Sequence, residues 1–168
     1  TSPAFRVWNR GKKSISLDLD DPESLRSVVK LIQGSDIVLE SFRPGVSDGW
    51  ALDYSSVKEI NPAIIYCSIT AFGPDGPWAL RHGYEGLVAA ASGIMTDQVG
   101  VREGPMFSSV PLASLGTSQL AVQGILAALH VRNVSGIGQR VEPACIKGRS
   151  RFGRLYCLRP TKYRSFRL

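Results

Sequence analysis

The chain has 168 residues, of which 43% are hydrophobic and 20% charged, a composition typical of one globular domain with its own core. Charged residues or glycine interrupt every apolar run before about 18 residues, and the N-terminal residues hold no apolar signal stretch, so we expect neither a transmembrane helix nor a secretory signal. Three cysteines without CxxC spacing and two isolated histidines indicate reduced thiols in the cytoplasm or an organelle matrix, and they predict no metal site.

The net charge of +6 is distributed unevenly. Residues 143–168 hold eight basic side chains and no acidic one, which leaves a net charge of −2 for residues 1–142. Aromatic residues lie among these arginines and could stack on bases. The near-neutral body and the lack of a binding motif favour instead a basic tail that adheres to polyanions only non-specifically. We therefore expect no specific nucleic-acid partner.

The first third of the sequence predicts strand, helix and strand. Residues 13–21 alternate apolar side chains with Ser and Asp, which indicates a strand. Asp21 is a candidate N-cap, Pro22 fits the first helical position, and Gly34 ends the helix. Residues 36–41 form a short, largely buried strand, and residues 42–50 form a loop.

The rest of the sequence continues this alternation. A short helix over 53–60 ends before an Asn-Pro pair, and the uninterrupted apolar run 63–70 is typical of a central strand in a parallel sheet. A turn-rich loop over 71–83 precedes a helix over 84–95. The longest helix occupies the stretch Val110 to Leu129, and residues 133–142 lead out of it into a strand.

Alternating strands and helices with short links predict an α/β fold with a parallel sheet and flanking helices. Ligands of such sheets bind beyond the carboxyl ends of the strands. Here those ends carry "ESFRPG" (40–45) and "TAFGPDGP" (70–77). Neither GxGxxG after a strand nor GxxxxGK[ST] occurs, so the two standard nucleotide-binding fingerprints are missing.

Five blocks of this sequence, in this order and spacing, resemble the family III CoA-transferases, a family that also contains carnitine and formyl-CoA transferases and α-methylacyl-CoA racemases. The blocks are "NRGKKSISLDL" followed by "PES", "DIVLESFRPG", "INPAIIYCSITAFGPDGP", "GYEGLVAAASGIM" and "GILAALHVRNVSGIGQRVE". The resemblance covers residues 3–142. It does not distinguish the transferase branch from the racemase branch.

The resemblance implies a Rossmann-like open sheet that is an incomplete part of the family's large domain, over residues 1–142. The family has a first βα unit before "NRGKKS", and after "GQRVE" it continues into an apolar helix and a small domain. Residues 143–168 match neither pattern, so we expect a basic, irregular tail that arises from a shifted or read-through frame. Intact relatives are interlocked homodimers that use acyl-CoA and a carboxylic acid as substrates, without a permanently bound cofactor.

The resemblance also assigns site residues. Leu17, Phe42, Pro44 and Gly45 match the CoA pocket, with the adenine against the Phe42 loop. Tyr84 and Glu85 match an aromatic–acid pair near the thioester, and Ser114 matches the nucleophile. Four of these assignments have a plainer alternative: Ser114 is then a helix N-cap, Glu85 a carboxylate favoured by the helix dipole, and Phe42 and Tyr84 ordinary packing aromatics.

This chain departs from the family where the chemistry is done. In the transferases an aspartate attacks the thioester and forms an acyl anhydride, which a carboxylate then opens. Ser114 replaces that aspartate and cannot form an anhydride, and Tyr84 stands where the racemases have a histidine. Ser41 and Gly49 replace an Asn and an Arg that contact CoA in relatives. We therefore expect an acyl-CoA transferase relative without transfer activity; the alternatives are a non-catalytic CoA-binding or partner subunit, or a truncated product without function.

Overall fold

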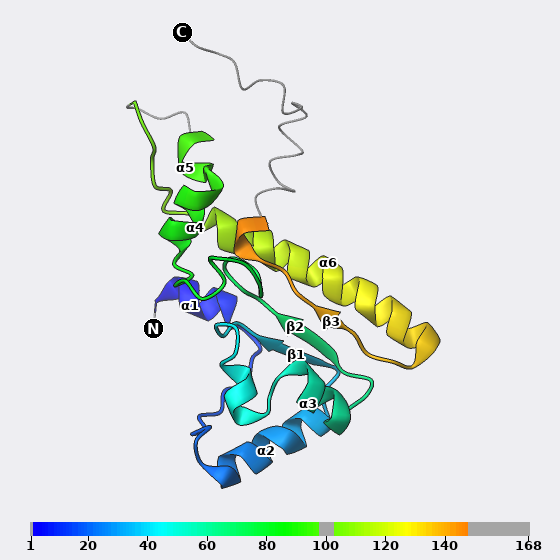
Figure 1. Ribbon diagram of the computed structural model, residues 1–168. Coiled ribbons are helices and arrows are strands. Elements are labelled where there is room, and N and C mark those ends of the chain that lie inside the picture. The colour runs from blue at the N-terminus through cyan, green and yellow to red at the C-terminus, as the bar shows by residue number, and fades with distance from the viewer. Residues whose placement is uncertain (1, 98–102, 148–168) are drawn as a thin grey trace.

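The computed structural model describes residues 2–97 and 103–147 (Figure 1). Its centre is a three-stranded parallel sheet in the order β1 (Ile37–Glu40), β2 (Ile65–Ser68), β3 (Arg140–Val141). The register pairs Ile37 with Ile65 and Tyr66 with Arg140. The prediction of an α/β fold with a parallel sheet is therefore confirmed.

Helices cover the two faces of this sheet differently, as Figure 1 shows. On one face, α2 (Pro22–Gln33) and α3 (Tyr54–Ile60) enclose a core of Ile32, Val57, Ile64 and Tyr66. On the other face lies α6 (Leu112–Ser135). Since side chains of a strand alternate between faces, both faces of β2 are covered: all four of its residues are buried, the apolar Ile65, Tyr66 and Cys67 and the polar Ser68.

The starts of α2 and α3 follow from local capping. The Asp21 carboxylate accepts the amide N–H of Ser24 at 2.9 Å, and Pro22 fills the first helical position, as predicted. The Asp53 carboxylate caps α3 in the same way, through the amides of Ser55 and Ser56. Asn61 then joins the two helices, because its side-chain amide donates to the carbonyls of Ile32 and Ser35.

Close packing of α6 depends on two glycines. A Cβ on Gly124 would lie 2.5 Å from the Cγ1 atom of Val141, so glycine lets the helix approach β3 closely. A Cβ on Gly138 would lie 1.8 Å from the carbonyl oxygen of Ile64, where the chain turns from α6 into β3. The C-terminal end of α6 is fixed to the start of β1 by an ion pair, in which Nη1 of Arg132 lies 3.0 Å from Oδ1 of Asp36.

The strand predicted over residues 13–21 is wrong. Residues 12–18 have no regular secondary structure, and Ile15 is 66% exposed. Alternation creates a strand only where a neighbouring strand supplies hydrogen bonds, and within the described residues none pairs with this segment. Instead, a short helix that was not predicted, α1 (Pro3–Trp8), precedes it.

Several predicted boundaries also shift. The helix predicted over 84–95 is divided into α4 (Glu85–Ser92) and α5 (Ile94–Asp97), because Gly93 adopts a left-handed conformation. The predicted loop 42–50 ends in a short 3-10 helix, η1 (Ser47–Trp50). The longest helix runs six residues beyond Leu129 and stops at Gly136, the first position suited to a left-handed C-cap.

Among the described residues, helix α6 is long and apolar enough to cross a membrane by length and composition alone. Its most apolar stretch of 18 residues has a mean hydropathy of 1.4, and 28% of that stretch is buried. The buried residues of the helix are all small: Ala113, Gly116, Thr117, Ala121 and Ala128. This pattern is equally typical of a helix whose small-residue face packs on a sheet.

The first residues of the predicted tail continue alongside β2. Ala144 is buried and pairs with Thr70, and the Cys145 amide donates to the Thr70 carbonyl at 2.8 Å. Residues 148–168, most of the predicted basic tail, lie outside the described residues.

Candidate functional site

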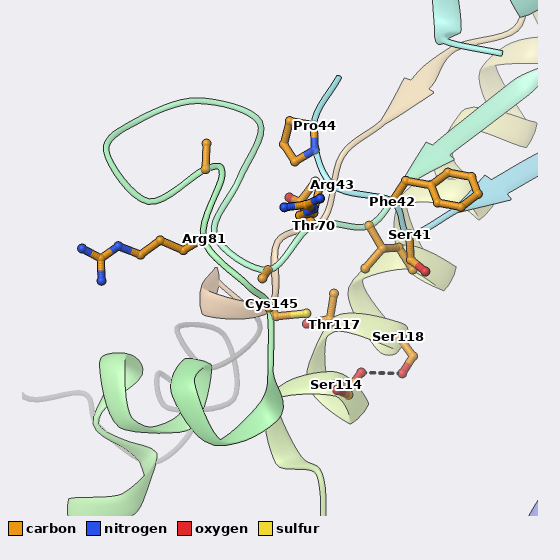
Figure 2. Close-up of a pocket in the computed structure, with 14 residues that line it drawn as sticks. Ser41, Phe42, Arg43, Pro44, Thr70, Arg81, Ser114, Thr117, Ser118 and Cys145 are labelled. Atoms are coloured by element: carbon orange, nitrogen blue, oxygen red, sulfur yellow. Dashed lines mark hydrogen bonds between the residues drawn. The ribbon is translucent and has the colours of Figure 1, made fainter. Parts of the chain in front are cut away.

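A cavity of about 420 Å³ opens where the segments after β1 and β2 meet the N-terminus of α6 (Figure 2). Residues 41–44 line it from the β1 side and residues 69–71 from the β2 side. Ser114, Thr117 and Ser118 of α6 close it from below, with Cys145 beside them (Figure 2). This is the carboxyl edge of the parallel sheet, where a ligand site was predicted.

Two predicted site residues are in direct contact at the mouth of α6. The Ser114 hydroxyl donates to Oε2 of Glu85 at 2.5 Å. The same carboxylate accepts the Ala113 amide at 2.8 Å and the Ser114 amide at 3.1 Å. Glu85, the first residue of α4, thus caps a second helix that begins almost thirty residues later in the sequence.

This contact corrects the plainer interpretation of Ser114. Pro111 is the N-cap of α6, it offers no side-chain hydrogen bond, and Ser114 is the third helical residue. The free amides of a helix N-terminus favour an anion. Glu85 is the anion that satisfies them, so Ser114 is left exposed at the cavity with its hydroxyl directed to a carboxylate.

Other hydroxyls of α6 near the cavity are occupied by the backbone. The Thr117 hydroxyl donates to the Ala113 carbonyl at 2.7 Å, and the side chain is buried. The Ser118 hydroxyl donates to the Ser114 carbonyl at 2.7 Å, as the dashed line in Figure 2 shows. Such bonds within one helix turn leave these two side chains less suited to chemistry than Ser114.

Three of the four predicted CoA-pocket residues, Phe42, Pro44 and Gly45, line two adjoining cavities. Phe42 and Pro44 line the cavity that contains Ser114. They also line a second, more polar cavity of about 430 Å³, whose wall includes Gly45. Phe42 is 42% exposed and packs edge-on against Trp50, with ring centroids 5.6 Å apart. An exposed aromatic ring that a neighbouring ring holds in place is a suitable surface for stacking a ligand.

Two predicted residues lie elsewhere. Tyr84 is the N-cap of α4 and is 66% exposed; it stacks on His82 with ring centroids 5.7 Å apart and lines neither cavity. Leu17 is half-buried in the irregular segment that was predicted as a strand, and it also lines neither cavity. The structure therefore brings together Ser114, Glu85, Phe42 and Pro44 but not Tyr84 or Leu17.

Sequence reasoning did not single out three residues of this site. Arg43 lines both cavities, and its place between Phe42 and Pro44 could have identified it, because CoA carries phosphates. Arg81 lines the first cavity, but its guanidinium lies over the Trp78 ring and points away from the other side chains in Figure 2. Cys145 had no sequence signal, because it falls in the segment predicted as an irregular tail.

The two described cysteines have little thiolate character. Burial chiefly raises the pKa of the Cys145 thiol, and the nearby Glu85 charge adds to this effect. Burial, with the Glu40 charge, raises the pKa of Cys67 to about 11. Cys67 is completely buried in β2, which confirms its prediction as a buried thiol, and a protonated thiol is a poor nucleophile.

Comparison with known proteins supplies the context for this geometry. The sequence pattern of CoA-transferase family III matches residues 1–155. The chain is 39% identical over 143 residues to a succinate–glutarate CoA-transferase of Agrobacterium fabrum, covering 84% of this chain and 36% of that protein. It is 38% identical to a formyl-CoA:oxalate CoA-transferase of Streptomyces coelicolor, covering 83% of this chain and 34% of that protein.

Solved structures agree with these sequence relatives. A CAIB/BAIF family protein from Brucella suis superposes with a TM-score of 0.80 at 35% identity, over 87% of this chain and 40% of that one. Rv3272 from Mycobacterium tuberculosis gives a TM-score of 0.78 at 29% identity, over 94% and 46%. The chain thus spans about a third of the length of the curated relatives and less than half of the solved ones.

Proposed function

This chain belongs to CoA-transferase family III, and from that membership we propose that it is an acyl-CoA-binding part of an acyl-CoA transferase relative, silent in CoA transfer. One observation carries the proposal. Ser114, at the nucleophile position that the resemblance assigns, lines the same cavity as Phe42 and Pro44. For the whole protein we propose a CoA thioester and a carboxylic acid as substrates, together with the homodimer that the resemblance implies.

The chemistry of Ser114 explains why we expect no CoA transfer. Transfer between carboxylates requires an intermediate of about thioester energy, so that CoA can return to the acyl group. An anhydride of an aspartate meets this requirement, whereas a serine ester is more stable and does not return its acyl group to CoA. The remainder of the site supplies an aromatic ring at Phe42 and a cation at Arg43 for binding.

Binding is tested by titrating the chain with CoA in a calorimeter. We expect saturable binding that the Phe42→Ala variant weakens about tenfold, since a lost aromatic contact is worth about 1.4 kcal/mol. Leu31→Ala is the control, because Leu31 is also an exposed apolar residue, lies on α2 and lines neither cavity. Absence of CoA binding would overturn the proposal and favour a truncated product without function.

Transfer is tested with succinyl-CoA and glutarate, and with formyl-CoA and oxalate, by following the new thioester. We expect the chain to transfer no more than its Ser114→Ala variant. Transfer clearly above that variant would contradict the silent interpretation. Transfer gained by Ser114→Asp would support the proposal, because the nucleophile alone would then be what the site lacks.

A further inference from the structure

We propose that Ser114 accepts the acyl group of a CoA thioester irreversibly, with Glu85 as its base, so that the chain becomes acylated instead of passing the acyl group on. The inference rests on the proposed function, because it requires acyl-CoA to enter the cavity beside Ser114. It goes further, because it assigns to this site a chemistry that an anhydride-forming transferase does not use.

The geometry is that of a nucleophile with its base and an orienting group. The Ser114 hydroxyl donates directly to Oε2 of Glu85. Two main-chain amides, those of Ala113 and Ser114, hold the carboxylate in place from the helix end. A hydroxyl within hydrogen-bond reach of a base that is itself oriented by further hydrogen bonds is the arrangement of activated serine nucleophiles. Ser114 is also exposed at the cavity, so an acyl carbon can reach it.

The reaction balances without any further reactant. The Ser114 oxygen forms a bond to the acyl carbon as its proton passes to Glu85. The carbon–sulfur bond of the thioester then breaks, and the proton moves from Glu85 to the sulfur, so CoA leaves as the free thiol. The products are an acyl-serine ester, CoA and an ionised Glu85. Water alone can later hydrolyse the ester, which releases the carboxylic acid and restores Ser114.

The same hydrogen bonds predict a slow reaction. A developing oxyanion at the helix mouth needs free N–H donors, and each missing donor costs about 10²–10³-fold in rate. Here Glu85 occupies the amides of Ala113 and Ser114, and the amides of Leu112 and Leu115 donate to the carbonyls of Val110 and Pro111. We therefore expect one slow acylation per chain and little turnover.

The test uses the whole chain with glutaryl-CoA. It measures the free thiol that is released, the mass of the intact protein and the masses of its peptides. We expect CoA release that levels off near one equivalent per chain, and a mass increase of one glutaryl group on the peptide that contains Ser114. The adduct should survive neutral hydroxylamine, as an ester does. An adduct that hydroxylamine removes would place the acyl group on Glu85 or on Cys145, which lines the same cavity, and would overturn the inference.

Three variants identify the groups involved. Ser114→Ala should abolish the adduct. The variant keeps the hydrogen bonds that the Ala113 and Ser114 main-chain amides donate to the Glu85 carboxylate, so α6 stays capped. Glu85→Gln should slow acylation at least 100-fold, since it removes the base but retains an amide oxygen for the cap. Ser27→Ala is the control, because this exposed hydroxyl on α2 donates only to the Glu23 carbonyl among the contacts of the described residues and lies in neither cavity wall.

The outcomes separate this inference from the proposed function. If the calorimeter shows CoA binding but glutaryl-CoA leaves no ester on Ser114, acylation is overturned and the CoA-binding function stands. If acylation proceeds equally in Ser114→Ala, the inference is likewise overturned. An ester confined to Ser114 and dependent on Glu85 supports it.

Discussion

At the scale of single residues, carboxylates cap the starts of three helices of this protein, α2, α3 and α6. Asp21 and Asp53 cap the helices that follow them directly in the sequence. Glu85 caps α6 from another helix, because Pro111 at its N-cap position offers no side-chain acceptor. Helix α6 therefore gains its capping group only when α4 is packed beside it.

The stabilisation that the Asp53 carboxylate gives to α3 should depend on pH, and the Asp53→Ala variant tests this. Hydrogen bonds from the Ser56 side chain and the following amides hold the pKa of Asp53 below its ordinary value of 3.8. A depressed pKa means that the stabilisation is present above the unfolded-state value and is lost as pH falls through the folded-state value. We expect the variant to lose about 1 kcal/mol of unfolding free energy at pH 7, and the difference to shrink below pH 4, in urea titrations at several pH values.

Ser24→Ala provides a comparison for that experiment. The hydrogen bond from the Ser24 amide chiefly lowers the pKa of Asp21, and the Ser24 side chain adds to this effect; the variant loses the side chain but retains the amide. A difference between Asp53→Ala and the parent chain that stayed constant from pH 7 to pH 3 would contradict the assigned role of the carboxylate.

At the scale of elements, the turn between α6 and β3 has no room for a side chain at Gly138. The Gly138 amide donates to the Pro62 carbonyl at 3.0 Å, which fixes the turn against the start of β2. No side chain fits there, because the first carbon of one would overlap the Ile64 carbonyl.

Gly138→Ala should therefore destabilise the protein by about 3 kcal/mol or more, because the backbone on both sides must move apart to admit the methyl group. Gly136→Ala differs in cause: its φ of 74° strains an alanine, but a Cβ there meets no neighbour within 4 Å. We expect its cost to be about 1 kcal/mol. Equal unfolding midpoints for the two variants in urea would contradict the steric argument.

The extent to which elements were predictable depends on whether their determinants are local. Asp21, Pro22 and Gly34 all act within one helix, so α2 was predicted to within a residue. The 13–21 segment has the right alternation, but strand formation depends on a partner elsewhere in the chain. The contact between Glu85 and Ser114 could likewise not be predicted, because no local sequence pattern indicates that residues so far apart in the chain form a hydrogen bond. The resemblance named both residues without indicating that they bond to each other.

At the scale of the whole molecule, large apolar side chains remain uncovered. On α6 the exposed ones include Val122, Leu126, Val131 and Val134, and Leu87 of α4 is half exposed. Small soluble proteins seldom leave such a surface open. The match spans about a third of the length of a curated relative, so segments like those of the relative that lie outside this match would cover such a surface.

We expect this chain to self-associate, with a weight-average mass above that of one 18.2 kDa chain in sedimentation at micromolar concentration. Replacing Val122 and Leu126 by Glu should shift it toward the monomer, because the charges cannot be buried in an apolar contact. Ile15→Glu serves as control, since Ile15 is exposed outside α6. A parent chain that sediments only as monomer would contradict the expectation.

The pairing of β2 with β3 has a consequence for how the protein is synthesised. Tyr66 in β2 pairs with Arg140 in β3. One edge of β2 therefore lacks its hydrogen-bonding partner until the ribosome has synthesised β3, much later in the chain. At a translation rate of about 5–20 residues per second, that edge stays open for several seconds of synthesis. During this interval the nascent chain exposes an apolar strand without its partner, and a chaperone that shields residues 64–69 should raise the yield of folded protein more than one acting after release.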